Sequence, residues 1–396
     1  MASSSFGVYV HFPYCLSKCG YCDFLSVPSE PPSIPHAAYA DAILAELERR
    51  PGSVAGSPVH SIFFGGGTPS LWKSAELGRV LEALRRHFPE VDEGAEITVE
   101  CNPSSFDAEK ARELRALGVN RISLGIQSLN RERLGFLGRR HDENAGLEAI
   151  GIARAAGFAN ISADFIFGVA GQSPSEAEAE AQRIADSEVS HLSAYALTIE
   201  PGTQFGELAR SGRLPLLPDE QVAEAFERVR STLEERGFIH YEISNYARPN
   251  AEARHNLGYW RGEPYLGLGV GAWGTLTANG TAKTRYRNTP SLERYLASRD
   301  PGLDVRLDRE GSFVASLENI TPEVDLAERL MLGLRLAEGG ELGWLEAESG
   351  ARVHTRERRR ALEKWLERGA LTLEGQRLRL AKAHWLLADA VIRELL

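Results

Sequence analysis

Short apolar runs alternate with longer amphipathic segments over roughly the first 240 residues of the chain. The apolar runs predict strands at Gly7–His11, His60–Phe64, Ile97–Glu100, Arg121–Gly125, Ile161–Phe167 and His191–Thr198. The amphipathic segments predict helices at His36–Arg50, Ser74–His87, Asp107–Leu117, Asn144–Ala156, Pro174–Ser187 and Asp219–Arg236. Strands that alternate with helices in this way are typical of parallel βαβ units. The pattern therefore predicts an α/β fold built on an open, partial (β/α)6 barrel.

The pattern changes after this barrel segment. Residues 246–319 are rich in glycine and aromatic residues, which predicts a cover over the barrel mouth followed by a connector. The last part of the chain predicts two helices, Pro322–Ala337 and Thr355–Arg368, and then a hairpin over Leu371–Leu380. Helices followed by a hairpin indicate a small winged-helix-like domain. The predicted division is a core barrel at 1–245, a cover and connector at 246–319 and a C-terminal domain at 320–396.

Composition agrees with this division and narrows the class of protein. At 396 residues the chain is long enough for a barrel of about 250 residues and a smaller domain. Its net charge of −10 argues against a broad nucleic-acid-binding surface. No apolar run approaches the roughly 18 residues that a membrane-spanning helix needs. The short stretch before the first strand leaves no room for a signal peptide, so we expect a cytoplasmic protein.

Three of the four cysteines lie close together directly after the first predicted strand. Cys15, Cys19 and Cys22 have the spacing C-x3-C-x2-C. Three thiolates on so short a loop suit one soft metal centre, either zinc or an iron–sulfur cluster. A structural zinc site usually has a fourth Cys or His ligand, and the only other cysteine, Cys101, is far along the chain. A cluster held by three cysteines would leave one iron open, while a zinc loop and buried structural cysteines remain alternatives.

Distinctive polar and glycine residues follow several of the predicted strands. The run Gly65, Gly66, Gly67 and Thr68 follows the second strand, where it forms either a ligand-binding loop or simply a tight turn. Glu100 ends the third strand, Gln127 follows the fourth and Asp164 lies in the fifth. In a barrel of parallel strands the chemistry sits where strands end, so we expect these residues on one rim. Buried carboxylates there need partners, such as an ammonium group or ribose hydroxyls.

The cysteine spacing resembles the signature of the radical S-adenosylmethionine (SAM) enzymes. That resemblance implies a [4Fe–4S] cluster whose open iron binds SAM. Over nearly its whole length the chain resembles the coproporphyrinogen-oxidase-like branch of these proteins. The matching motifs are Tyr9-Val-His-Phe-Pro-Tyr-Cys15, Phe63-Phe-Gly-Gly-Gly-Thr-Pro69, Glu100-Cys-Asn-Pro103, Arg121-Ile-Ser-Leu-Gly-Ile-Gln-Ser128, Leu137-Gly-Arg-Arg-His141 and Asp164-Phe-Ile-Phe-Gly168.

The same resemblance implies which residues hold SAM. It assigns SAM contacts to Tyr9 and Gly65–Thr68, the amino acid end of SAM to Glu100 and Arg139, and its ribose to Gln127 and Asp164. Cys101 departs from the family pattern, which has a small residue such as Ala there. We expect Cys101 to be a packed apolar side chain and not a fourth ligand.

Two details favour one group within this branch. The anaerobic oxidase has a further cysteine two residues after the third, whereas this chain has Phe24 there. The segment His255-Asn-Leu-Gly-Tyr259-Trp260 resembles a signature of the heme chaperones known as HemW. Imidazole is a common axial ligand of heme iron, and aromatic side chains can pack on a porphyrin. The alternative for His255 is an ordinary loop histidine with a hydrogen-bond role.

Three hypotheses of function follow. The first is a heme chaperone that keeps the cluster and SAM and delivers heme to respiratory hemoproteins, with an electron donor for the cluster. The second is an oxygen-independent coproporphyrinogen III oxidase, a SAM-radical decarboxylase. The third is a zinc-stabilised binding module. A basic run at residues 352–364 is expected to be a solvated helix face, and peripheral membrane contact and the oligomeric state stay open.

Overall fold

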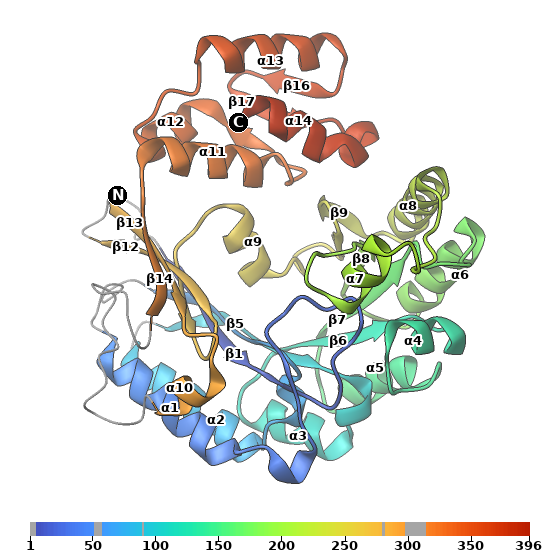
Figure 1. Ribbon diagram of the computed structural model, residues 1–396, viewed down its shortest axis with the longest axis vertical. Helices are drawn as coiled ribbons and strands as arrows, with labels where there is room; N and C mark the ends of the chain where they lie inside the picture. The colour runs from blue at the N-terminus through green and yellow to red at the C-terminus, as the bar shows by residue number, and fades with distance from the viewer. Residues whose placement is uncertain (1–4, 51–57, 89–90, 279–281, 298–313) are drawn as a thin grey trace.

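Six parallel strands form the centre of the molecule, as the alternating pattern predicts (Figure 1). A computed structural model describes residues 5–50, 58–88, 91–278, 282–297 and 314–396. The six strands, hydrogen-bonded in chain order, are β1 (Phe6–Phe12), β4 (Val59–Gly66), β5 (Val91–Cys101), β6 (Arg121–Gln127), β7 (Asn160–Phe167) and β8 (His191–Ala196). The two-residue strands β2 (Tyr14–Cys15) and β3 (Val27–Pro28) pair within the loop that follows β1.

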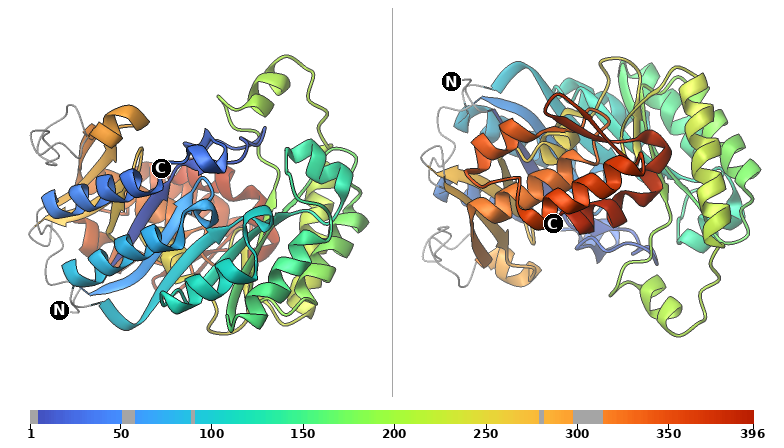
Figure 2. Two further views of the ribbon diagram at one scale, coloured as in Figure 1. Left: turned by 90° about the horizontal axis from the view of Figure 1, so that it is seen from below. Right: turned by 90° about the horizontal axis from the view of Figure 1, so that it is seen from above.

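Helices cover the outer face of these strands (Figure 2). They are α1 (His36–Arg49), α2 (Ser74–His87), α3 (Ala108–Ala116), α5 (Ala145–Ala155), α6 (Pro174–Ala185) and α8 (Asp219–Glu235). Their starts follow local sequence signals. The side chain of Asp107 accepts the backbone N–H of Lys110 at the start of α3, and Ser173 and Glu176 form a capping box at the start of α6. The predicted partial (β/α)6 barrel is confirmed.

Short helices in the connecting segments were not expected from the sequence. They are α4 (Arg131–Leu137), α7 (Gln204–Arg210), α9 (Arg254–Trp260) and α10 (Leu292–Ala297). Each has at most seven residues, and so short a segment has too few turns for helical periodicity to stand out. One of them, α9, lines the site described below, and α7 packs against the loop that carries the cysteines.

Residues 246–319 differ from the expected loop cover, because they widen the central sheet. Beyond β8 the sheet continues through β10 (Asn245–Ala247), at the start of this segment, and β9 (Ile239–Glu242), which precedes it. Beyond β1 it continues through β11 (Tyr265–Leu268), β12 (Trp273–Ala278), β13 (Ala282–Asn288) and β14 (Val314–Ile320). Strand β11 pairs in parallel with β1, so that Tyr9 lies opposite Gly267. Most of the expected connector, residues 301–313, lies outside the described residues.

The C-terminal segment has the helices and hairpin that the sequence predicts, with two further helices. Its elements are α11 (Pro322–Gly333), β15 (Gly340–Glu341), α12 (Leu342–Ser349), α13 (Arg356–Glu367), β16 (Leu371–Glu374), β17 (Arg377–Leu380) and α14 (Ala388–Leu395). The three strands form a small sheet of their own, in the order β15-β17-β16. This is a winged-helix-like arrangement of helices and a β-hairpin.

Ion pairs join this C-terminal segment to elements near both ends of the main sheet. Lys283 of β13 pairs with Asp325 at 2.6 Å, and Lys382 pairs with Glu234 of α8 at 2.8 Å. Seen from above, the orange and red C-terminal elements lie across the sheet (Figure 2, right). In the described part of the chain, no helix is both long and apolar enough to cross a membrane.

Candidate functional site

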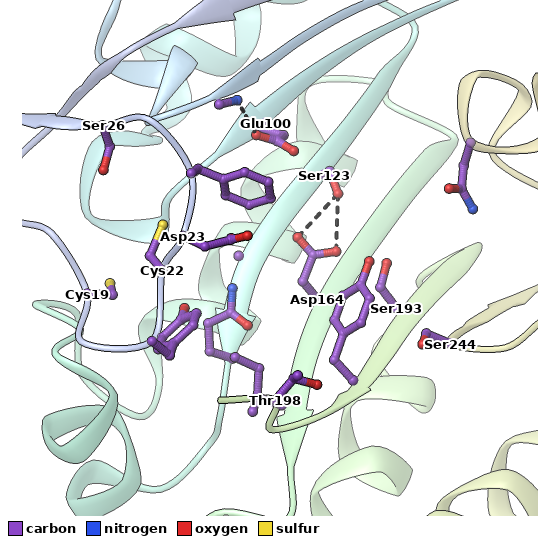
Figure 3. A pocket seen from close by; sticks show the side chains of 18 of the residues that line it. Cys19, Cys22, Asp23, Ser26, Glu100, Ser123, Asp164, Ser193, Thr198 and Ser244 are labelled. Carbon is purple, nitrogen blue, oxygen red and sulfur yellow. Dashed lines mark hydrogen bonds between the residues drawn. The ribbon is translucent and has the colours of Figure 1, made fainter. Parts of the chain in front are cut away.

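One cavity of about 1220 Å³ brings together most of the predicted site residues. The predicted residues in its wall are Tyr9, Cys15, Cys19, Cys22, Gly66, Gly67, Thr68, Glu100, Gln127, Arg139, Asp164, His255 and Tyr259. Of the predicted set, Gly65 and Trp260 do not line it. The cavity lies at the carboxyl ends of the parallel strands, beside the cysteine loop (Figure 3). This is the rim that carries the chemistry in barrels of this kind.

The three loop cysteines lie half-buried beside polar partners. Thr68 donates its hydroxyl to Cys15 Sγ at 3.3 Å, and Arg139 Nη1 lies 3.9 Å from Cys19 Sγ. Burial, together with the neighbouring Cys19 and Cys15, raises the pKa of Cys22 to about 11. Thiols that ionise so reluctantly by themselves need a nearby positive charge, which a metal centre supplies on binding.

The arrangement of these thiols fits a cluster better than a single metal ion. Among the described residues, no three His, Cys, Asp or Glu side chains are gathered closely enough to hold one ion. Cysteine ligands of a four-iron cluster bind separate irons, so they do not need to converge on one point. Cys101 stands apart from the loop: it is 4% exposed, its Sγ faces the Val99 carbonyl at 3.6 Å, and burial raises its pKa strongly.

The glycine loop holds the cysteine loop against the end of β1. Gly66 has φ +108°, which only glycine adopts without strain, and a Cβ there would collide with the His11 ring. The backbone N–H of Gly67 donates to the Phe12 carbonyl at 2.7 Å, and that of Thr68 donates to the Tyr14 carbonyl at 2.9 Å. The loop is therefore more than a turn, because it fixes Thr68 next to the first cysteine.

Two half-buried carboxyl groups face the cavity from β5 and β7, the strands on either side of β6 (Figure 3). Glu100 accepts the backbone N–H of Gly66 at 3.0 Å, and burial together with the nearby Asp164 raises the pKa of Glu100 to about 7. Asp164 lies 3.4 Å from the Ser123 hydroxyl, and burial raises the pKa of Asp164 also. Carboxyl groups in this state gain most from a cationic or hydroxyl-bearing ligand.

Arg139 and Gln127 complete this wall. Arg139 donates from Nη2 to the Gly125 carbonyl at 2.6 Å, while its buried Nε has no hydrogen-bond partner in the described structure. Gln127 has φ +68°, in the left-handed region where a side chain other than glycine is strained. Strain of this kind is concentrated at functional sites.

These residues fit the two predicted cofactors. Cys15, Cys19 and Cys22 would hold the cluster, Glu100 the amino group of SAM, Arg139 its carboxylate, and Asp164 and Gln127 its ribose hydroxyls. Bound SAM would supply radical chemistry through reductive cleavage of its sulfonium. The protein's own part is to bind and orient: Glu100 as a carboxylate attracts a cation, and the free Nε–H of Arg139 can donate to an anion.

The side chain of His255 is buried and does not lie in an open loop. Its Nδ1 lies 2.8 Å from Ser61 Oγ, its Nε2 lies 3.0 Å from the Tyr259 hydroxyl, and its ring stacks on Phe63 at 5.1 Å. His255 is 3% exposed, and burial lowers its pKa to about 3. Trp260 points elsewhere, since Arg335 lies over its ring at 5.8 Å. A heme role for this motif stays a prediction.

Four further polar residues of the barrel interior were missed at the sequence level. Ser61, Arg121, Ser123 and Ser193 all lie in the parallel strands, and three of them, Arg121, Ser123 and Ser193, line the cavity. The missed signal is their period of two: Arg121, Ser123, Gly125 and Gln127 alternate along β6 with buried apolar residues. In a strand this spacing places every second residue on the same face.

Comparison with known proteins identifies the family. A model of the radical SAM superfamily matches residues 9–184, and a model of the HemN C-terminal domain matches residues 320–387. The heme chaperone HemW of Mycobacterium tuberculosis is 36% identical over an alignment that covers 100% of this chain and 96% of that protein. The chain belongs to the HemW family of radical SAM proteins. The HemW of Escherichia coli is 37% identical over 74% of this chain and 77% of its own length.

A solved structure supports the fold of this HemW-family chain. Coproporphyrinogen III oxidase (HemN) from Escherichia coli matches with a TM-score of 0.80 over 99% of this chain and 90% of its own, at 21% identity. At that identity the likeness concerns the fold alone. The family assignment confirms the resemblance predicted from the motifs and favours the heme chaperone over the oxidase. Radical SAM proteins carry a [4Fe–4S] cluster and bind SAM, so both are cofactors of this chain.

Proposed function

We propose that this chain is a heme chaperone that binds heme beside its cluster and SAM and passes the heme to an acceptor protein. The observation that carries the proposal is the extent of the cavity. At about 1220 Å³ it exceeds the roughly 300–1000 Å³ of a typical small-molecule site. Its wall runs from the cysteine loop past His255 to Trp385 and Leu386 of the C-terminal segment. SAM at the predicted residues would leave room for a second, larger ligand.

The axial ligand in this proposal is His255, with Tyr259 and Trp260 as its aromatic neighbours. Because His255 Nε2 is hydrogen-bonded to Tyr259, iron binding there requires that the Tyr259 hydroxyl gives way. Burial keeps the imidazole neutral at physiological pH, and the neutral form is the one that binds metals. The names of the relatives, heme chaperone HemW, support heme as the ligand.

The proposal extends to the proteins that would accept heme from this chain or donate electrons to its cluster. We place the protein in the cytoplasm, where clustered thiols stay reduced, with respiratory hemoproteins as acceptors and a separate electron donor for the cluster. We also propose that the chain is divided into a core barrel at residues 1–245, a cover and connector at 246–319 and a C-terminal domain at 320–396.

Two assays on anaerobically reconstituted protein test this function together. Heme titration should give a saturable change in the heme spectrum, and His255→Ala should alter that spectrum or weaken binding. An exposed histidine on α2 provides the matched control, so His87→Ala should leave the spectrum unchanged. Coproporphyrinogen III with SAM and a reductant should not be decarboxylated. Robust decarboxylation with no specific heme binding would refute the chaperone and establish the oxidase.

A further inference from the structure

The β12–β13 hairpin contributes an aromatic side chain and a cation to one wall of the cavity. Trp273 and Arg287 lie opposite each other in the hairpin, with the guanidinium 5.4 Å from the centre of the indole ring. Both side chains line the cavity, and Trp273 is 43% exposed. Figure 1 shows this hairpin next to β14, below the C-terminal elements. The wall therefore offers an apolar face with a positive charge above it.

Arg287 lacks the acidic partner that its neighbour on the same strand has. Arg285 pairs with Glu318 at 3.2 Å and with Glu328 at 2.5 Å. Within the described structure, no ion pair or hydrogen bond reaches the side chain of Arg287, whose contact is the one with the Trp273 ring, and its Nε is buried. The chain carries ten more acidic than basic charges, so acids are plentiful. An unpaired guanidinium on a cavity wall is suited to an anionic ligand, especially a carboxylate.

The end of the cysteine loop reaches the same wall. The side chain of Leu25 packs on Gly271, where an added Cβ would collide with it, so the loop lies against the residues just before Trp273. The adjacent Phe24 is 59% exposed and also lines the cavity. An exposed phenylalanine costs free energy in water, and in the sequence it stands between the last cluster ligand, Cys22, and the Leu25 that packs on Gly271.

We propose that Phe24, Trp273 and Arg287 form the seat of the heme, in which the two aromatic side chains pack on the porphyrin and Arg287 binds a propionate. The inference rests on the proposed heme function and goes beyond the axial motif. It assigns a role to Phe24, which stands where the anaerobic oxidase has its further cysteine. A flat aromatic ligand with carboxylates on one edge matches both the apolar surface and the guanidinium of Arg287 beside it.

The test compares two ligands that differ only in the charge of their propionates, heme and its dimethyl ester. Wild-type protein should bind heme more tightly than the diester. Arg287→Gln should weaken heme binding about ten- to hundredfold, the size of a hydrogen bond to a charged group, and should leave diester binding unchanged. Arg287→Lys should restore part of the preference. The matched control, Arg356→Gln, removes an exposed arginine outside the cavity and should change neither affinity.

A second variant tests the contribution of the aromatic side chain. Trp273→Ala should weaken the binding of heme and diester alike, because it removes packing and not charge. Retained SAM-dependent perturbation of the cluster spectrum would show that each variant is folded. If wild-type and Arg287→Gln proteins show the same preference for heme over the diester, this seat is wrong while the chaperone function stands. If the wild-type protein binds neither ligand, the proposed function itself fails.

Discussion

The helix α7 holds the cysteine loop in place through one aromatic side chain, Phe205. The backbone N–H of Phe205 donates to the Gly20 carbonyl at 2.8 Å, and its ring lies so close to Gly20 that an added Cβ would be 2.5 Å away. The ring also packs on Phe136 at 4.9 Å and on Tyr21 at 6.4 Å. We therefore expect Phe205→Ala to loosen the loop that carries the cluster.

The size of the effect follows from burial and from where the ring packs. Phe205 is 5% exposed, and truncation of a buried phenylalanine to alanine costs about 3–5 kcal/mol. Phe205 belongs to a small apolar cluster, with Leu137 and Leu214, that is separate from the main core. The loss should therefore favour local opening of α7 and not global unfolding. At 1.4 kcal/mol per factor of ten, the open state should become on the order of 10²–10³-fold more populated.

The assay is iron loss from the reconstituted protein to an excess of chelator, without oxygen. If opening and closing are fast, the rate of loss follows the open population, so Phe205→Ala should lose iron at least about a hundredfold faster. Phe158→Ala is the matched control, because Phe158 is 2% exposed in the main core. It should lower the melting temperature with little change in iron loss. Equal rates of loss in the wild-type and Phe205→Ala proteins would refute the role given to α7.

Three further outcomes are expected. Cys22→Ala should lose the four-iron cluster, whereas Cys101→Ala should keep it, as iron and sulfide analysis will show; iron loss in the Cys101 variant would contradict the three-ligand loop. Asp164→Ala should weaken SAM binding with cluster content intact, and unchanged affinity would mean that the ribose site lies elsewhere. Because the pKa of Glu100 is about 7, protonation of its carboxylate between pH 8 and pH 6 should weaken SAM binding about tenfold. Glu100→Gln should flatten this dependence, so a persistent slope in that variant would assign it to another group.

The barrel could be predicted because its signals are local. Two of the barrel helices carry their own side-chain cap, Asp107 for α3 and Ser173 for α6, and the central strands are runs of mainly apolar residues. Strand β11 carries no such signal: it has four residues, and it is fixed by pairing with β1, more than 250 positions away in the sequence. Contacts at that separation leave no periodic trace in the segment itself. The prediction of a loop cover over 246–319 was wrong for that reason.

Site residues could be predicted where their position along a strand places them in the site. They could not be predicted where contacts with distant side chains place them there. Glu100 and Gln127 stand at the ends of β5 and β6 and Asp164 lies in β7, so parallel strands bring them to one cavity. Phe205 packs against the cysteine loop from a short helix, and Arg287 lines the cavity from the β12–β13 hairpin. Their roles depend on neighbours such as Gly20 and Trp273 that only the folded chain supplies.

His255 and Arg287 differ in what heme binding would require of them. Both ring nitrogens of His255 are already bonded, to Ser61 and Tyr259, so iron can bind only after one of these bonds breaks. Arg287 has no such bond to lose among the described residues, and Trp273 beside it is already exposed. Capture of a porphyrin by its propionates therefore needs no rearrangement, whereas axial ligation needs Tyr259 to move. We expect heme to be held first at the hairpin, with ligation by His255 as the slower and separable step.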